Sequence, residues 1–246
     1  MDYITIYNDY KSLGIDCRSI TEGEENDMVN DFIDYKVDNY KSKQHRELAV
    51  FKETKIANSF PDLLFVEYDP FAFDKWNDKR ASLTSDDIKI LYYIYEKYGV
   101  SSDLIIKRLS INSNTCLKTL EHLLDANLIQ RKNGKWSILD RKSIFGIHSI
   151  EAVEAKIGKF DEVTQQAISN ATFASKSSIL CKRKTNYQDK QLDFIKMLGL
   201  GAYRCNDAGF ESVVDPLDRK YPNNFYSIYI NECLGKVLTQ CNLDVR

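Results

Sequence analysis

An apolar run at residues 150–156 reads Ile-Glu-Ala-Val-Glu-Ala-Lys, and it constrains the fold because it carries charges inside a segment typical of a buried strand. Side chains two residues apart point to the same face of a strand, so Glu154 and Lys156 emerge together, about 7 Å apart along its axis. Two charges on one face of a buried strand are costly unless they are paired, bound to a metal or used in chemistry. The run therefore predicts a sheet that carries a charged site.

A second apolar run begins with an acid. Residues 60–66 read Phe-Pro-Asp-Leu-Leu-Phe-Val, and proline is tolerated at the first position of a strand. Asp62 is therefore expected at the start of this strand. If the strand of Glu154 and Lys156 is its neighbour, two carboxylates suited to Mg²⁺ lie beside an ammonium group.

Pro61-Asp62 followed by Glu154-Ala155-Lys156 resembles the signature of the PD-(D/E)xK nuclease superfamily, which has the restriction-endonuclease-like fold. The residues that follow strengthen the resemblance, because residues 161–180 predict a helix with a Gln-Ala pair, then Phe-Ala and a strand. The resemblance covers residues 46–72 and 144–215. It departs from the family's pattern in one way, since far more residues separate Asp62 from Glu154 than a hairpin needs.

The resemblance implies a metal-dependent nuclease that hydrolyses DNA. Asp62, Glu154 and the carbonyl of Ala155 would hold Mg²⁺ or Mn²⁺. Lys156 would orient or deprotonate the attacking water, or offset charge on the phosphorane. These roles come from the resemblance, whereas the residue pattern alone supports a charged site on a mixed sheet.

Two further residues are candidates for the catalytic site. Gln166 precedes Ala167 in the expected helix, and a glutamine at this place in related nucleases approaches the site or the nucleic acid backbone. Glu53 offers the additional acid that related nucleases often use for metal binding. A surface amide and an exposed strand charge are the alternative interpretations of these residues.

The long insertion between Asp62 and Glu154 has its own pattern of apolar spacing and turn residues. It predicts helices at residues 84–98 and 102–109 and a third helix that starts at Asn112 or Ser113. A hairpin follows, and the Asn133-Gly134 turn between its strands is a strong hairpin signal. This order resembles a winged helix-turn-helix domain, whose DNA-binding members place the third helix in the major groove.

The exposed side of that third helix would carry Ser113, Asn114, Thr115, Lys118 and Thr119. Basic residues of the hairpin and of the core offer contacts to phosphate groups. The expected DNA-binding residues are Ser113, Asn114, Lys118, Arg131, Lys132, Lys135, Lys182 and Arg183. Many winged helices bind only protein or pack inside their own chain, so a structural or protein-binding role stays open.

Composition limits where such a protein acts. The net charge is −2, so any nucleic-acid surface must be a local patch rather than a global basic field. The six cysteines include no Cys-x-x-Cys pair, which favours thiols in a reducing cytoplasm. No run of about 18 apolar residues occurs, so we expect a cytoplasmic protein without a membrane span.

These patterns predict a mixed α/β (α+β) protein with a central sheet flanked by helices. Its expected parts are a helical arm at 1–45, a discontinuous nuclease-like core at 46–80 and 143–246, and an inserted winged helix at 81–142. Within the core, residues 46–51 are expected to end a helix, residues 52–56 to form a strand, and residues 226–237 to form a helix on the core.

Two other functions compete with the nuclease. The first is a non-catalytic winged-helix DNA-binding or adaptor protein built on a nuclease-like platform. The second is a protein-interaction module without nucleic-acid contact. A nuclease of this kind would have DNA as its partner, and a homodimer is an assembly that the resemblance allows.

Overall fold

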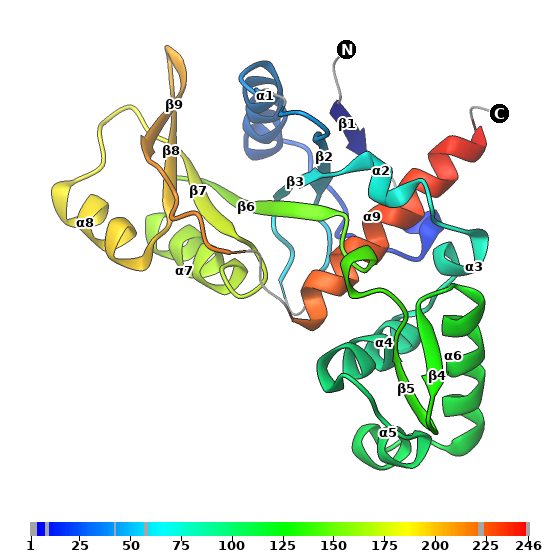
Figure 1. Cartoon of the computed structure of the whole chain (residues 1–246). Helices are drawn as coiled ribbons and strands as arrows, with labels where there is room; N and C mark the ends of the chain where they lie inside the picture. The colour runs from blue at the N-terminus through cyan, green and yellow to red at the C-terminus, as the bar shows by residue number, and fades with distance from the viewer. Residues whose placement is uncertain (1–3, 8–9, 42, 57–58, 221–223, 245–246) are drawn as a thin grey trace. The chain divides into compact units, whose positions relative to one another are not determined.

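The computed structural model describes residues 4–7, 10–41, 43–56, 59–220 and 224–244 of the 246-residue chain. The chain forms two compact units (Figure 1). Residues 1–69 and 147–222 form the first, which we call the sheet unit. Residues 70–146 and 223–246 form the second, which we call the helical unit. Each unit is thus assembled from segments that are distant in sequence.

One mixed sheet organises the first unit. In the described residues its strand order is β1-β2-β3-β6-β7-β8-β9. The β2–β3, β3–β6 and β8–β9 pairs are antiparallel, and the β1–β2, β6–β7 and β7–β8 pairs are parallel. The strands are β1 (Ile4–Tyr7), β2 (Glu47–Lys52), β3 (Leu63–Tyr68), β6 (Ile147–Ile157), β7 (Lys176–Lys182), β8 (Gly201–Asn206) and β9 (Gly209–Val214).

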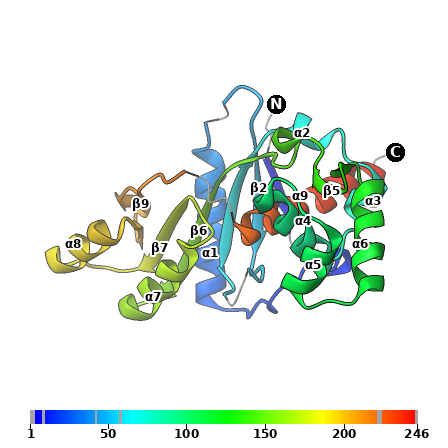
Figure 2. The same cartoon turned by 60° about the horizontal axis from the view of Figure 1, so that its bottom comes forward.

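Helices cover both faces of this sheet, which confirms the predicted mixed α/β class (Figures 1 and 2). Helix α1 (Glu24–Asp38) packs on one face, where its Phe32 belongs to one core with Leu63 and Val153. Helices α7 (Phe160–Asn170) and α8 (Asp189–Leu198) pack on the other face, where Ala167 and Ile195 share a second core. Side chains alternate between the faces of a strand, so β7 contributes Leu180 to the first core and Ile179 to the second.

The first 45 residues are not a separate arm, as the domain prediction had it. Strand β1 pairs with β2, and α1 buries Met28, Val29, Phe32 and Ile33. These four positions form an apolar stripe along the helix, and such a stripe has to cover another apolar surface. A short 3₁₀ helix, Lys11–Leu13, precedes α1. The N-terminal segment therefore belongs to the sheet unit.

The predicted boundary between helix and strand near residue 52 is wrong. Residues 47–52 form β2 rather than the end of a helix, and Glu53 follows the strand with a φ of 52°. Strand β2 lies between β1 and β3, and Leu48, Ala49, Val50 and Phe51 are all buried. A short continuous apolar run does not distinguish a strand from a helix by periodicity.

The helical unit confirms the helices and the hairpin expected at residues 84–138. Thr84 and Asp87 cap the first helix reciprocally, and the Asn112 side chain accepts a hydrogen bond from the Thr115 amide. Asn133 and Gly134 have φ values of 51° and 73°, as a type I′ turn requires. The elements are α2 (Pro70–Phe73), α3 (Asp78–Ala81), α4 (Ser85–Lys97), α5 (Ser102–Leu109), α6 (Ser113–Asp125), β4 (Ile129–Lys132), β5 (Lys135–Ile138), a 3₁₀ helix (Arg141–Ser143) and α9 (Phe225–Asp244).

The position of the last helix differs from the predicted domain division. Helix α9 was expected on the nuclease-like core, but it belongs to the helical unit, where Ile228 joins the apolar core of α4 and α6. Residues 70–80 and 143–146, also expected in the core, lie in the helical unit as well. Helical periodicity shows that α9 has a buried face but does not identify its partner. Among the described helices none is long and apolar enough to cross a membrane.

Candidate functional site

The two motifs meet at one end of the sheet. Strand β2 ends at Lys52 opposite Leu63, the first residue of β3, and Leu63 in turn pairs with Val153 of β6. Strand β6 continues to Ile157 beyond the start of β3, so its edge there has no ladder partner from β3. Asp62 fills that place, because its Oδ2 accepts a hydrogen bond of 2.7 Å from the amide of Ala155.

Asp62 and Glu154 are close enough at this end of the sheet to interact electrostatically. Val153 belongs to the core under α1, so the next side chain, Glu154, points to the opposite face, which carries α7. Asn170 of α7 donates a hydrogen bond of 2.7 Å to Glu154 Oε1. Asp62 is 3% exposed and Glu154 is 1% exposed. The site therefore holds two carboxylates that are almost wholly removed from water.

Burial perturbs every acid of this cluster. It raises the pKa of Glu154, and the charge of Asp62 raises it further. Burial also raises the pKa of Asp62. The pKa of Glu53 is raised to about 7 by burial and by the charge of Asp62. Neighbouring buried carboxylates of this kind favour either a shared proton or a bound cation.

Lys156 brings an ammonium group to the same place. Its Nζ donates a hydrogen bond of 2.8 Å to Glu25 in the first turn of α1, and its side chain is 13% exposed. Burial acts to lower the pKa of Lys156, but the hydrogen bond to Glu25 and the charge of Asp62 outweigh it, so that pKa is raised. Lys156 is therefore a charged donor in this state rather than a proton acceptor.

Two hollows open beside the acids. The first, about 480 Å³, is lined by Glu53, Asp62 and Lys156, and we call it the acid hollow. The second, about 440 Å³, is lined by Glu154 and Gln166, and we call it the amide hollow. The Oε1 atom of Gln166 is buried without a hydrogen-bond partner. Each of the five catalytic candidates thus lines one of these hollows, with Asp62 at the acid hollow and Glu154 at the amide hollow.

The donor set suits a hard divalent cation. One Glu154 oxygen, Oε2, is buried and has no hydrogen-bond partner. The N–H and C=O of one strand residue point to the same side, so the Ala155 carbonyl faces Asp62 as its amide does. Within the described ranges, no three His, Cys, Asp or Glu side chains form a complete metal cage. Mg²⁺ does not require one, since it keeps several waters and uses one or two carboxylates.

Three neighbours of the acids were not predicted. Arg18 contacts both Glu53 and Asp62, Asn170 holds Glu154, and Glu25 holds Lys156. Asn170 could have been found, because it lies four residues after Gln166 and thus on the same side of α7. Arg18 lies in a segment without helical or strand periodicity, so no signal in the sequence connects it with the site.

The predicted contacts on α6 are mostly accessible. Ser113, Asn114 and Lys118 are exposed. Thr119, expected on the same side, is buried and forms a side-chain hydrogen bond with Asp87. It faces the inside of the helical unit because it lies three residues after the buried Cys116 and four before the buried Leu123. Thr119 is therefore excluded as a ligand contact, and the other three remain available.

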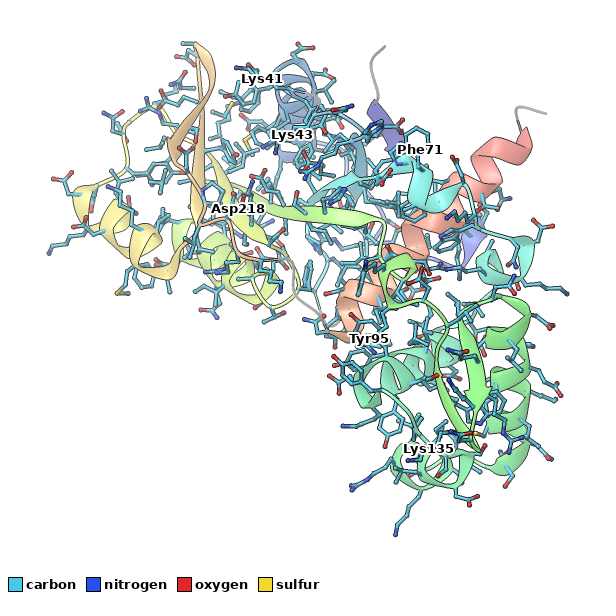
Figure 3. The ribbon with its side chains drawn as sticks, viewed as in Figure 1. Lys41, Lys43, Phe71, Tyr95, Lys135 and Asp218 are labelled. Carbon is cyan, nitrogen blue, oxygen red and sulfur yellow. The ribbon has the colours of Figure 1, made fainter. Side chains whose placement is uncertain are left out.

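The basic residues divide into two groups. Arg131, Lys132 and Lys135 are exposed on the hairpin, where Figure 3 labels Lys135. Lys182 and Arg183, in contrast, are engaged within the sheet unit. Lys182 Nζ lies 2.5 Å from Glu24, and Arg183 donates to Gln191 while stacking on Tyr187. The hairpin thus offers the more available cations.

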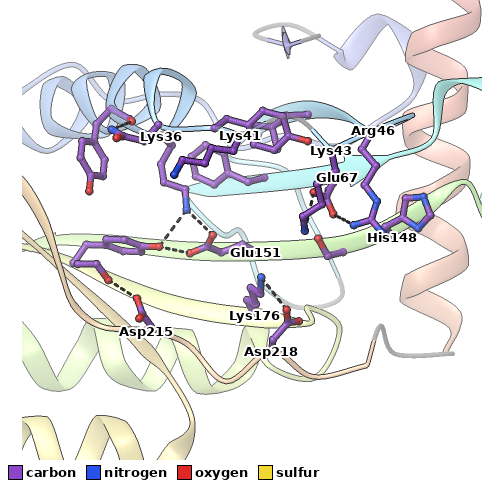
Figure 4. A pocket seen from close by; sticks show the side chains of 18 residues that line it. Lys36, Lys41, Lys43, Arg46, Glu67, His148, Glu151, Lys176, Asp215 and Asp218 are labelled. Atoms are coloured by element: carbon purple, nitrogen blue, oxygen red, sulfur yellow. Dashed lines mark hydrogen bonds and ion pairs between the residues drawn. The ribbon is translucent and has the colours of Figure 1, made fainter. Parts of the chain in front are cut away.

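Another hollow, about 530 Å³, opens on the face of the sheet that carries α1 (Figure 4). Three acids of its lining each hold a basic partner. Lys36 lies 2.7 Å from Glu151, Arg46 lies 2.6 Å from Glu67 and Lys176 lies 3.1 Å from Asp218. These charges neutralise one another, whereas Glu154 keeps a buried oxygen without a partner, which makes the opposite face the better candidate for chemistry.

No family model, curated protein or solved structure matches this chain.

Proposed function

We propose that this protein is a metal-dependent nuclease that hydrolyses DNA phosphodiester bonds. In this proposal the sheet unit is a restriction-endonuclease-like core and the helical unit contains an inserted winged helix. One observation carries it. Asp62 and Glu154 are two buried carboxylates at one end of the sheet, beside the charged Lys156, and an oxygen of Glu154 lacks a partner.

Asp62, Glu154 and the Ala155 carbonyl would hold Mg²⁺ or Mn²⁺. A bound ion of this kind supplies Lewis-acid activation of a phosphoryl oxygen and lowers the pKa of a bound water. The Ala155 amide orients Asp62, and Asn170 orients Glu154. Fixed carboxylates reduce the reorganisation that binding requires, so the chain itself prepares the site for the cation.

The remaining residues would act on the substrate. Lys156 carries a positive charge and can donate a hydrogen bond to a phosphoryl oxygen or to the attacking water, which stabilises charge that develops in the transition state. Gln166 presents its amide in the amide hollow, where it can contact a phosphate or that water. Glu53 adds a third acid at the acid hollow.

The test is a cleavage assay on plasmid and oligonucleotide DNA with Mg²⁺ or Mn²⁺. The variants are Asp62→Asn, Glu154→Gln and Lys156→Met, which keep side-chain size while removing charge. We expect each to lower the cleavage rate at least about 100-fold, the scale of losing a group that acts in the transition state. Glu162→Gln and Lys159→Met are matched controls. Lys159 directly precedes α7 and forms an i,i+3 ion pair with Glu162 in its first turn, and at least half of each side chain is exposed.

Controls that cleave like wild type, together with three inactive variants, would establish the site. Metal-dependent cleavage that survives in Glu154→Gln would contradict the proposal. Absence of cleavage on duplex, single-stranded and branched DNA by the wild-type protein would also contradict it.

A second candidate is a protein-binding or adaptor role of the helical unit. It is favoured by α6, because Leu117 and Leu124 are 54% and 39% exposed and lie two turns apart on one side of the helix. Exposed leucines of this kind suit a protein surface better than the phosphate backbone of DNA.

A DNA-binding assay at two salt concentrations separates the candidates. If the hairpin binds phosphates, the triple variant Arg131→Glu, Lys132→Glu, Lys135→Glu weakens binding at least tenfold, and the salt dependence of binding becomes less steep. Leu117→Ser is the control and should leave DNA binding unchanged. Unchanged DNA binding in the triple variant would favour the protein-binding role.

A further inference from the structure

Arg18 is held beside the acids by its backbone. The Arg18 amide donates a hydrogen bond of 2.9 Å to the Glu53 carbonyl, and the Lys55 amide donates one of 2.9 Å to the Asp16 carbonyl. Cys17 and Thr54 form an antiparallel bridge between these two hydrogen bonds. The segment at residues 16–18 is thus paired with residues 53–55, which brings the Arg18 side chain to the open end of the sheet.

The Arg18 guanidinium lies between two site carboxylates. Its Nε donates to Glu53 Oε2 at 2.9 Å, and its Nη2 lies 2.7 Å from the same oxygen and 3.3 Å from Asp62 Oδ1. The side chain of Arg18 is 47% exposed, whereas those of Glu53 and Asp62 are 16% and 4% exposed. The cation therefore reaches the acids from the solvent side. It lines both the acid hollow and the amide hollow.

This position competes with a metal ion for the same oxygen. Asp62 Oδ2 is occupied by the Ala155 amide, so Oδ1 is the oxygen left for a cation, and Arg18 contacts that oxygen. A divalent ion on Asp62 would stand a few ångströms from the guanidinium, and the two like charges would repel each other. The half-exposed arginine can change rotamer without disturbing its paired backbone.

We propose that Arg18 is an exchangeable counter-cation, which neutralises Asp62 and Glu53 in the metal-free protein and leaves Asp62 when a divalent cation binds. This inference rests on the proposed nuclease function. Once displaced, the guanidinium stays anchored near Glu53 and becomes a bidentate donor for a substrate phosphate, a geometry that arginine suits and lysine does not. Arg18 thus couples metal binding to substrate binding.

The experiment is a titration of the whole protein with Mn²⁺, in which the free ion is measured by electron paramagnetic resonance, without DNA. Arg18→Met removes the competing charge, so we expect Mn²⁺ to bind about tenfold more tightly. Arg18→Lys keeps the charge, so its Mn²⁺ affinity should stay within about twofold of wild type. In the cleavage assay both variants should be at least about tenfold slower, because neither can contact a phosphate in bidentate fashion.

Lys55→Met is the matched control. It removes one positive charge from the neighbouring segment, where Lys55 pairs with Asp16 and not with the site acids. Its Mn²⁺ affinity and cleavage rate should equal those of wild type. Arg18→Gln is a second substitution in case Arg18→Met unfolds, which circular dichroism would reveal.

The outcomes separate this inference from the nuclease proposal. If wild type binds Mn²⁺, Glu154→Gln does not, and Arg18→Met binds no more tightly than wild type, the counter-cation role is wrong while the metal site stands. Weaker Mn²⁺ binding by Arg18→Met would likewise overturn it, since Arg18 would then be a positioning residue for Asp62. If wild type binds no Mn²⁺, the metal site itself is wrong.

Discussion

At the end of the sheet, single ionisable residues are buried although burial disfavours their charged forms. Glu154 is 1% exposed and shares its surroundings with Asp62, yet one of its oxygens has no hydrogen-bond partner. A core position of this kind is normally apolar, because an uncompensated buried charge is strongly unfavourable. Acids at these positions therefore lower the stability of the metal-free fold, and under the proposed function they are kept because they would bind a cation.

This conflict predicts how stability depends on pH. Burial raises the pKa of Glu53 in the folded protein to about 7, above its ordinary value of 4.5. A raised carboxyl pKa means that the folded state binds more protons than the unfolded state between these values, so its contribution to stability is present below about pH 4.5 and is lost as pH rises through about 7. We expect the metal-free protein to lose roughly 1–3 kcal/mol from this group between pH 5 and pH 8.

Urea unfolding of wild type and Glu53→Gln at pH 5 and pH 8, in the presence of a chelator, measures this effect. An amide does not ionise, so the variant should lose less stability than wild type over the same interval. Glu162→Gln is the control, because Glu162 is half exposed. Equal losses in wild type and Glu53→Gln would show that Glu53 does not titrate abnormally.

At the scale of elements, the length of β6 decides where the site lies. Strand β6 extends beyond the first residue of β3. The edge of β6 past Val153 therefore has no partner from β3, and the Ala155 amide there donates to the Asp62 side chain. If β3 began two residues earlier, the Asp62 backbone would enter the ladder and its side chain would lose the hydrogen bond from Ala155. The register of three strands therefore sets the geometry of the candidate site.

Buried charges also join the elements of the helical unit. Arg80 of α3 donates to Glu232 of α9 through Nε at 3.0 Å and Nη2 at 2.7 Å, and to the Ile144 carbonyl at 3.0 Å. Its guanidinium lies 3.9 Å from the centre of the Trp76 ring. The pair is satisfied on both sides, which is the condition under which a buried ion pair is tolerated.

Breaking this pair tests its contribution to the fold. Arg80→Met leaves the Glu232 carboxylate buried without its partner, so we expect the free energy of unfolding to fall by about 3–5 kcal/mol. Arg80→Met combined with Glu232→Leu removes both charges and should recover much of that loss. Urea unfolding followed by circular dichroism measures both.

Lys89→Met is the control for the ion-pair experiment, because Lys89 forms an exposed i,i+3 pair with Asp86. Exposed pairs contribute about 0–1 kcal/mol. A loss below about 1 kcal/mol in Arg80→Met would contradict this prediction, because the ion pair would then contribute no more than an exposed pair does.

For the whole molecule, each of the two units is built from two separate segments of the chain. The helical unit requires residues 223–246 as well as residues 70–146. Without α9, Arg80 would lose Glu232 and the core would lose Ile228. A domain boundary drawn along the chain from the inserted segment alone would therefore leave this unit incomplete.

Fragments test that division. Residues 70–146 alone should show no cooperative thermal transition, whereas the same residues joined to 223–246 by a flexible linker should unfold cooperatively, as followed by circular dichroism. The apolar surface that α9 covers would otherwise face water, and a unit of this size has little stability to spare. If residues 70–146 alone unfolded cooperatively at the same midpoint temperature as the linked fragment, α9 would not be needed for the helical unit to fold.

Local patterns in the sequence determined the elements with the strongest periodicity and turn chemistry. The three helices of residues 85–125 follow from apolar spacing and the caps at Thr84 and Asn112, and the hairpin follows from Asn133-Gly134. The strand that follows Asp62 and the strand that contains Glu154 were also predictable, because each apolar run includes or directly follows an acid that is conspicuous in a buried segment. These features depend on residues that are near one another in sequence.

Tertiary structure decided what depends on distant partners. The assignment of α1 to the sheet unit and of α9 to the helical unit depends on which apolar surfaces meet, which periodicity cannot specify. The same holds for Arg18, whose place beside Glu53 and Asp62 is fixed by backbone pairing with residues 53–55. Patterns of period 2 or 3.6 report that a face is buried, but the contacts between distant segments determine what buries it.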